Sequence, residues 1–131
     1  MQALRVGVAG LGTVGAGVVR LLAENASVIA ARAARKIVVS AVSARDSARD
    51  RGVSLAGMNW HDDPVGLATD ADVDVVVELI GGSEGPAKSV VEAAILAGKP
   101  VVTANKALLA VHGSTLAEMA EAAGGFWSGA Y

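Results

Sequence analysis

A glycine-spaced turn between an apolar strand and a helix constrains this chain most. Residues 10–15 read Gly-Leu-Gly-Thr-Val-Gly and directly follow the apolar segment 4–9. In such a turn the first glycine permits a sharp reversal, the second lets a pyrophosphate approach the backbone, and the third lets the helix pack on the strand. The helix N-terminus then offers free N–H groups and a favourable dipole to the phosphates. We therefore expect a dinucleotide-binding turn, rather than a tight turn without a ligand, made by Gly10, Leu11, Gly12, Thr13, Val14 and Gly15.

The composition favours a buried parallel sheet covered by helices. Hydrophobic residues make up 53% of the 131 residues, but aromatic residues only 3%. The core must therefore consist mainly of Val, Leu, Ile and Ala, which is typical of such sheets. The length indicates one domain, residues 1–131. The chain has no cysteine, which excludes disulfides and thiolate chemistry.

Charge and hydropathy exclude several classes of partner. The net charge is -2 and the isoelectric point is about 5.6, so the chain lacks the basic surface that nucleic-acid binding requires. Its apolar runs are shorter than the ~18 residues of a membrane-spanning helix. The first residues read as a strand and not as a secretory signal. We therefore expect a cytoplasmic protein that binds neither nucleic acid nor a membrane.

Strand and helix patterns alternate along the chain. Gly98 is expected to follow the end of one helix, and Asn25, Asp63 and Ser114 are expected to cap the starts of three others. The alternation predicts an α/β fold, a doubly wound, mostly parallel sheet of the Rossmann-like kind. Strands are expected at 4–9, 37–42, 73–80, 100–103 and 126–128, and helices at 13–24, 28–35, 64–69, from Pro86 to before Gly98, and from Ser114 to before Gly124; 43–57 is expected to be a loop.

Ligands of this fold bind beyond the carboxyl ends of the strands, which directs attention to the segment after the second strand. An acid there would bind the ribose hydroxyls of NAD, whereas an arginine would bind the 2′-phosphate of NADP. Arg45 precedes Asp46 and favours NADP. A register error of one residue would bring Asp46 inward instead. The charged run 45–51 is otherwise interpreted as a solvated turn.

Two further strand ends carry candidate residues. Gly82 and Ser83 follow the strand beside the glycine turn, where they would contact the nicotinamide-side ribose and phosphate or form a plain turn. Glu78 is a lone acid in that apolar strand, and the sequence does not decide between a polar pocket and a satisfied core carboxylate. Thr103 ends the next strand, and Lys106 follows it.

Lys106 is the strongest candidate for chemistry. A lysine there can bind a substrate carboxylate or a cofactor phosphate, or assist proton transfer if burial lowers its pKa. The alternative is a surface lysine at the start of a helix. His61 and His112 are interpreted as surface or turn residues, because neither has acids at metal-ligand spacing, and we expect no metal site.

Three segments together resemble homoserine dehydrogenases. They are 10–17, which holds the glycine turn; 76–82, Val-Val-Glu-Leu-Ile-Gly-Gly; and 98–106, Gly-Lys-Pro-Val-Val-Thr-Ala-Asn-Lys. The Thr-Ala-Asn-Lys ending is the specific part, because other dehydrogenases share the glycine turn. The resemblance covers nearly the whole chain, and it implies NAD(P)-dependent interconversion of L-homoserine and L-aspartate 4-semialdehyde in threonine, methionine and isoleucine biosynthesis.

The resemblance also implies roles for single residues. Thr13 and Val14 match positions against the pyrophosphate, and Arg45 matches one near the adenosine 2′-phosphate. Thr103 and Lys106 match positions beside the nicotinamide and substrate, the lysine being tied to catalysis. Homoserine dehydrogenases continue into a substrate domain, which is absent from this chain.

The expected partners are therefore a small-molecule substrate in the complete enzyme, and either the missing domain or a homo-oligomer. Two alternatives stay open: a non-catalytic NAD(P)-binding regulatory module that acts with a partner, and a relative acting on another amino acid, such as an aspartate dehydrogenase. The Thr-Ala-Asn-Lys segment argues against the second.

Overall fold

The computed structural model describes residues 2–47, 49–124 and 127–129. It contains a six-stranded sheet in the order β3-β2-β1-β4-β5-β6, and all neighbouring strands are parallel. This confirms the predicted doubly wound α/β fold. The strands are β1 (Leu4–Ala9), β2 (Ile37–Ser43), β3 (Asn59–His61), β4 (Val75–Glu78), β5 (Val101–Thr103) and β6 (Trp127–Gly129).

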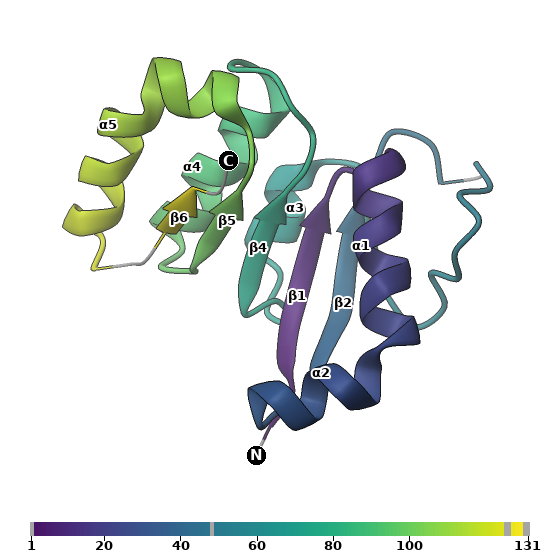
Figure 1. The fold of residues 1–131 in the computed structure, drawn as a ribbon. Coiled ribbons are helices and arrows are strands. Elements are labelled where there is room, and N and C mark those ends of the chain that lie inside the picture. Colours follow the sequence, from purple (N-terminus) through teal and green to yellow (C-terminus); the bar gives the residue numbers. More distant parts are fainter. Residues whose placement is uncertain (1, 48, 125–126, 130–131) are drawn as a thin grey trace.

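Helices cover both faces of this sheet (Figure 1). On one face, Val19 of α1 packs with Val8 and Val42. On the other face, the core contains Leu67, Val91 and Leu116, which come from α3, α4 and α5. The second helix, α2, buries none of its side chains. The helices are α1 (Thr13–Glu24), α2 (Ala26–Ala33), α3 (Pro64–Ala68), α4 (Pro86–Leu96) and α5 (Lys106–Ala122).

Helices α3 and α5 begin at a side-chain cap, and the start of α5 differs from the prediction. The Asp63 carboxylate accepts the N–H of Val65 at 3.0 Å and begins α3, as expected. Helix α5, however, begins at Lys106 and not after Ser114, because the Asn105 side chain accepts the N–H of Leu108 at 3.0 Å. Ser114 lies inside the helix and is exposed.

Other elements also differ from the sequence prediction. Helix α2 spans Ala26–Ala33 where 28–35 was expected. Asn25 precedes it, but its side chain donates to the carbonyl of Leu21 and does not cap that helix.

Strand β3 lies in a segment for which no strand was expected. Strand β4 is shorter than the predicted 73–80, because the N–H groups of Ile80 and Gly81 donate to the Glu78 side chain and not to a neighbouring strand. The predicted last strand included Phe126, which lies outside the described residues.

The last residues of all six strands lie in one row across the sheet. Ala9 pairs with Ser43 on one side and Glu78 on the other, and Glu78 pairs with Thr103. His61 and Gly129 complete the row at its two ends. The segments that follow the strands therefore emerge at one edge of the sheet, where candidate residues from distant parts of the chain meet.

Within the described residues, no single helix is long and apolar enough to cross a membrane. The one pair with sufficient combined length and apolarity, α1 with α2, is bent by 78°.

Candidate functional site

In the glycine turn between β1 and α1, Gly10 and Gly15 have no room for a side chain, whereas Gly12 has free space beside it. A Cβ atom on Gly15 would lie 1.8 Å from the carbonyl oxygen of Gly10, so the helix could not pack here with a larger residue. Gly10 has a φ of 102°, and a Cβ there would lie 2.8 Å from the Leu79 carbonyl oxygen. A Cβ on Gly12 would meet no described atom within 4 Å. The space beside Gly12 is thus accessible to a ligand.

Helix α1 presents an uncapped N-terminus to this space. Its N-cap residue is Gly12, which has no side chain to accept a hydrogen bond, and its first turn holds no acidic residue. The first amides of a helix lack partners within the helix and carry a partial positive charge. This end of α1 therefore suits an anion such as a phosphate.

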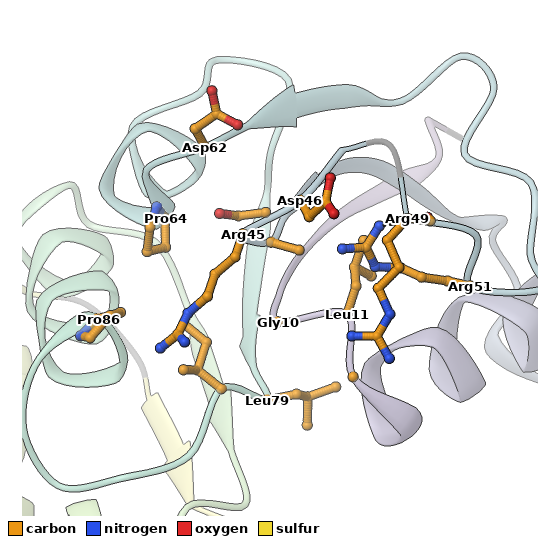
Figure 2. A pocket seen from close by; sticks show the side chains of 14 residues that line it. Gly10, Leu11, Arg45, Asp46, Arg49, Arg51, Asp62, Pro64, Leu79 and Pro86 are labelled. Carbon is orange, nitrogen blue, oxygen red and sulfur yellow. Dashed lines mark hydrogen bonds between the residues drawn. The ribbon is translucent and has the colours of Figure 1, made fainter.

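A pocket of about 340 Å³ lies along the carboxyl edge of the sheet. Gly10, Leu11 and Gly12 line it, and the segment after β2 supplies Arg45 (Figure 2). A second hollow of about 290 Å³ adjoins it and also contacts Leu11 and Gly12, together with Thr13. The structure thus brings the glycine turn and Arg45 together, as predicted from the sequence.

Three arginines of the segment after β2 border these hollows. Arg45 extends across the pocket toward Pro86, whereas Arg49 and Arg51 lie on the opposite side, near Leu11 (Figure 2). Arg51 also lies 5.6 Å from the ring centre of Trp60, in cation–π geometry. The sequence interpretation treated Arg49 and Arg51 as part of a solvated turn. The contact of Arg51 with Trp60 involves β3, which the sequence pattern did not predict.

The other predicted residues lie at the neighbouring strand ends. Gly82 follows β4 and is exposed, Ser83 beside it is half-buried, and Thr103 ends β5 with 1% of its surface exposed. Lys106 is exposed and is the first residue of α5. Val14 and Gly15 lie in the first turn of α1.

Glu78 has hydrogen-bond partners at both of its oxygens. It is 1% exposed, and one oxygen accepts the N–H groups of Ile80 at 2.7 Å and Gly81 at 3.0 Å. The other accepts the hydroxyl of Thr103 at 2.6 Å. Of the two interpretations that the sequence left open, the structure supports the satisfied carboxylate. Asn105 continues this network, and no role was assigned to it from sequence.

The two histidines lie in β3 and α5 and not in turns, they are partly exposed, and each has a carboxylate partner that the sequence did not indicate. Nε2 of His61 lies 2.7 Å from Asp70, and Nε2 of His112 lies 2.6 Å from Glu84. The hydrogen bond to His112 lowers the pKa of Glu84. No group of three or more His, Cys, Asp or Glu side chains that could hold a metal occurs among the described residues.

A parallel sheet in this order, with a glycine turn, an uncapped helix N-terminus and a pocket at its carboxyl edge, defines a dinucleotide-binding domain. The particular family follows from the comparisons. The family described as "Homoserine dehydrogenase, NAD binding domain" matches residues 10–128, and the chain belongs to it.

Relatives and solved structures agree with this assignment. A homoserine dehydrogenase from Corynebacterium glutamicum is 43% identical over 93% of this chain. The crystal structure of a homoserine dehydrogenase from Thiobacillus denitrificans covers 98% of the chain with a TM-score of 0.86 and 40% identity. A hyperthermophilic archaeal homoserine dehydrogenase in complex with NADPH covers 96% with a TM-score of 0.74; at 18% identity it supports the fold alone.

The relatives are much longer than this chain. The chain spans 27% of the Corynebacterium protein and 29% of the Thiobacillus chain. It therefore corresponds to the NAD-binding domain of these relatives.

Proposed function

We propose that residues 1–131 act as the cofactor domain for homoserine oxidation, in which a hydride passes between NAD(P) and the homoserine/aspartate 4-semialdehyde pair. The observation that carries this proposal is the meeting of the glycine turn with the strand ends at 78–82 and 103–106 along one edge of the sheet. Family membership supports the reaction, and the length match restricts this chain to the cofactor part.

The proposed cofactor site has an adenosine side and a nicotinamide side. The pyrophosphate lies at Gly10–Gly15, with Thr13 and Val14 at the helix N-terminus. Arg45 binds the 2′-phosphate of NADP, because it reaches into the pocket beside this turn (Figure 2) and its guanidinium is suited to phosphate. Gly82, Ser83 and Thr103 border the nicotinamide.

Lys106 is the proposed catalytic residue. Its position at the start of α5, exposed beside Thr103, allows its ammonium group to reach a substrate oxygen or carboxylate. When bound, the nicotinamide supplies the hydride chemistry, and the chain's own groups orient it. Hydride transfer also needs a substrate held in line with the cofactor, and we propose that a further domain or a second copy supplies those contacts.

The test is direct titration. The chain is mixed with NADPH and with NADH while nicotinamide fluorescence is followed, and homoserine oxidation is then assayed. We expect binding of both cofactors, tighter for NADPH, and turnover only in a chain of the relatives' full length. Absence of binding to either cofactor would overturn the proposal. Activity that appears only when a separate partner chain is added would favour the alternative, a regulatory module. A cytoplasmic location goes with the biosynthetic role and is proposed with it.

A further inference from the structure

A closed ring of hydrogen bonds joins the two loops on the nicotinamide side of the proposed site. Glu78 accepts the N–H of Gly81 at 3.0 Å and the hydroxyl of Thr103 at 2.6 Å. The N–H of Asn105 donates to that hydroxyl at 3.1 Å, and its side-chain amide donates to the Gly82 carbonyl at 2.6 Å. The loop after β4 and the loop after β5 are therefore tied together at two points.

The loop after β4 depends on these bonds for its shape. Gly81 and Gly82 have φ values of 92° and 85°, and both are exposed. Leu79 and Ile80 at the start of the loop pack against the core, but a Cβ on Gly81 would meet no described atom within 4 Å, so apolar packing does not hold the Gly81–Gly82 pair. Glycine backbone loses much conformational entropy when ordered. The hydrogen bonds to Glu78 and Asn105 are the contacts that offset this cost.

The loop after β5 is held by the same ring. The Asn105 side-chain oxygen caps α5 by accepting the N–H of Leu108, while its amide reaches Gly82. Because Asn105 is the N-cap residue, its position determines where Lys106 begins the helix. A leucine in place of Glu78 would fill the core without desolvating a polar group. The acid is therefore explained by the bonds that it accepts.

We propose that Glu78 is a positioning residue for the nicotinamide end of the site. Through Thr103 and Asn105 it holds the Gly81–Gly82 loop and the first turn of α5, with Lys106, in one relative arrangement. This inference rests on the proposed function, which places the nicotinamide and substrate between these loops. Glu78 is buried and acts through its neighbours, without contacting cofactor or substrate.

Two variants weaken the ring at different points with little change in shape. In Glu78→Gln, the neutral amide oxygen accepts the loop N–H groups more weakly than a carboxylate does. Its NH₂ then faces Thr103, whose oxygen must accept this bond as well as the Asn105 N–H, and whose own proton loses its acceptor. In Asn105→Ser, the hydroxyl still caps α5 but is too short to reach the Gly82 carbonyl as well. Asp74→Asn is the matched control. It alters a carboxylate at the opposite end of β4 that accepts the Arg5 N–H at 2.8 Å.

The ligands separate positioning from general damage. We measure the Kd of NADPH, and that of 2′,5′-ADP, which carries the adenosine side without the nicotinamide. Glu78→Gln and Asn105→Ser should each weaken NADPH about three- to tenfold, as expected for one hydrogen bond, and leave 2′,5′-ADP within about twofold. Asp74→Asn should lower the melting temperature and change neither Kd. Equal losses for both ligands, or no loss for NADPH, would overturn the positioning role.

A measurement without ligand keeps this inference separate from the proposed function. Amide hydrogen exchange in the free chain should be faster at Gly81 and Asn105 in Glu78→Gln, and unchanged at β1. Unchanged exchange at both amides would refute the ring as the element that orders these loops. If wild-type protein binds no cofactor at all, the proposed function fails first, and the exchange result still shows whether Glu78 holds the two loops.

Discussion

Arg5 and Arg45 lie at opposite ends of the sheet and differ in their partners. Arg5, at the start of β1, contacts Asp74 at 3.0 Å and Asp72 at 3.5 Å. The hydrogen bond to Asp74 raises the pKa of Arg5 and lowers that of Asp74. Arg45, after β2, reaches into the pocket (Figure 2) and has no carboxylate partner among the described residues.

In the acidic turn Asp70–Asp74, as at Arg5, charged side chains are paired with groups of other segments. Burial raises the pKa of Asp70, but hydrogen bonds from His61, the Asp72 N–H and Asn59 outweigh it and hold the pKa at about 2. Lys99 donates to the Asp70 carbonyl, and burial lowers its pKa. At this end of the sheet, charged side chains stabilise the fold by pairing with one another. At the carboxyl edge, donors such as Arg45 stay available, as a ligand site requires.

The largest loss of stability should come from a substitution at Gly15, where the glycine turn has no room for a side chain. Gly15→Ala places a Cβ against the Gly10 carbonyl, 1.8 Å away, and should lower the free energy of unfolding by about 3 kcal/mol or more. Gly17→Ala, two residues later in α1, meets no described atom within 4 Å and should stabilise by up to about 1 kcal/mol. Urea unfolding measures both. Similar values would show that the turn relaxes and that Gly15 is not required by packing.

Lys106→Ala should affect chemistry more than folding. In a chain of the relatives' full length, kcat should fall about 100-fold or more if the lysine assists proton transfer. Because Lys106 is exposed, the melting temperature should change little. Steady-state kinetics and thermal unfolding of the same preparations give the two values. Unchanged kcat would leave Lys106 as a surface residue at the start of α5.

Asp70→Asn tests whether the charges at the Arg5 end of the sheet stabilise the fold. It should lower the free energy of unfolding by about 1–2 kcal/mol, since the carboxylate accepts from His61 at 2.7 Å and Asn59 at 3.0 Å. The pKa of Asp70 is lowered, so its contribution is present above about pH 4 and is lost as the pH falls toward 2.

The pH dependence supplies the control for Asp70. Wild-type stability should decline between about pH 4 and pH 2, and that decline should be smaller in Asp70→Asn. Glu118→Gln alters an exposed carboxylate of α5 and should keep the wild-type slope. An unchanged slope in Asp70→Asn would contradict the lowered pKa.

The smallest effects should distinguish the two arginines most sharply. Arg45→Ala should weaken NADPH about tenfold and NADH about twofold or less, because only NADPH carries the 2′-phosphate. Arg5→Ala should leave both Kd values unchanged and lower the melting temperature slightly, since its ion pairs are partly exposed and exposed ion pairs contribute little to stability. Equal weakening of the two cofactors by Arg45→Ala would remove Arg45 from the phosphate site.

The sequence predictions were accurate where a feature depends on neighbouring residues, and they failed where it depends on residues far apart in the chain. The starts of α1, α3 and α4 follow adjacent glycine, aspartate or proline signals, and all three were predicted. The start of α5 was not, because Asn105 and Ser114 are both residue types that cap helices, and only the structure shows that Asn105 accepts the Leu108 N–H. Strand β3 reads Asn-Trp-His and lacks the β-branched run that indicated the equally short β5, Val-Val-Thr.

In the candidate site, the glycine turn and Arg45 were predicted, whereas Arg49, Arg51 and the role of Asn105 were not. Arg51 lies over Trp60, and Asn105 reaches a loop 23 residues earlier in the chain. Such contacts depend on how separate strands pair and on where their loops emerge. Side-chain type and local spacing carry no direct signal for them.

The sequence by itself determined the dinucleotide-binding turn, the alternation of strands and helices, and the family resemblance. These depend on short-range sterics and hydrophobic periodicity, which are legible within a few residues. Only the tertiary structure decided that Glu78 is a satisfied carboxylate, that each histidine has an acid partner, and that Arg5 is paired while Arg45 faces the pocket. Pairings such as Arg5 with Asp74, 69 residues apart, arise from strand register, because register decides which distant side chains share one end of the sheet.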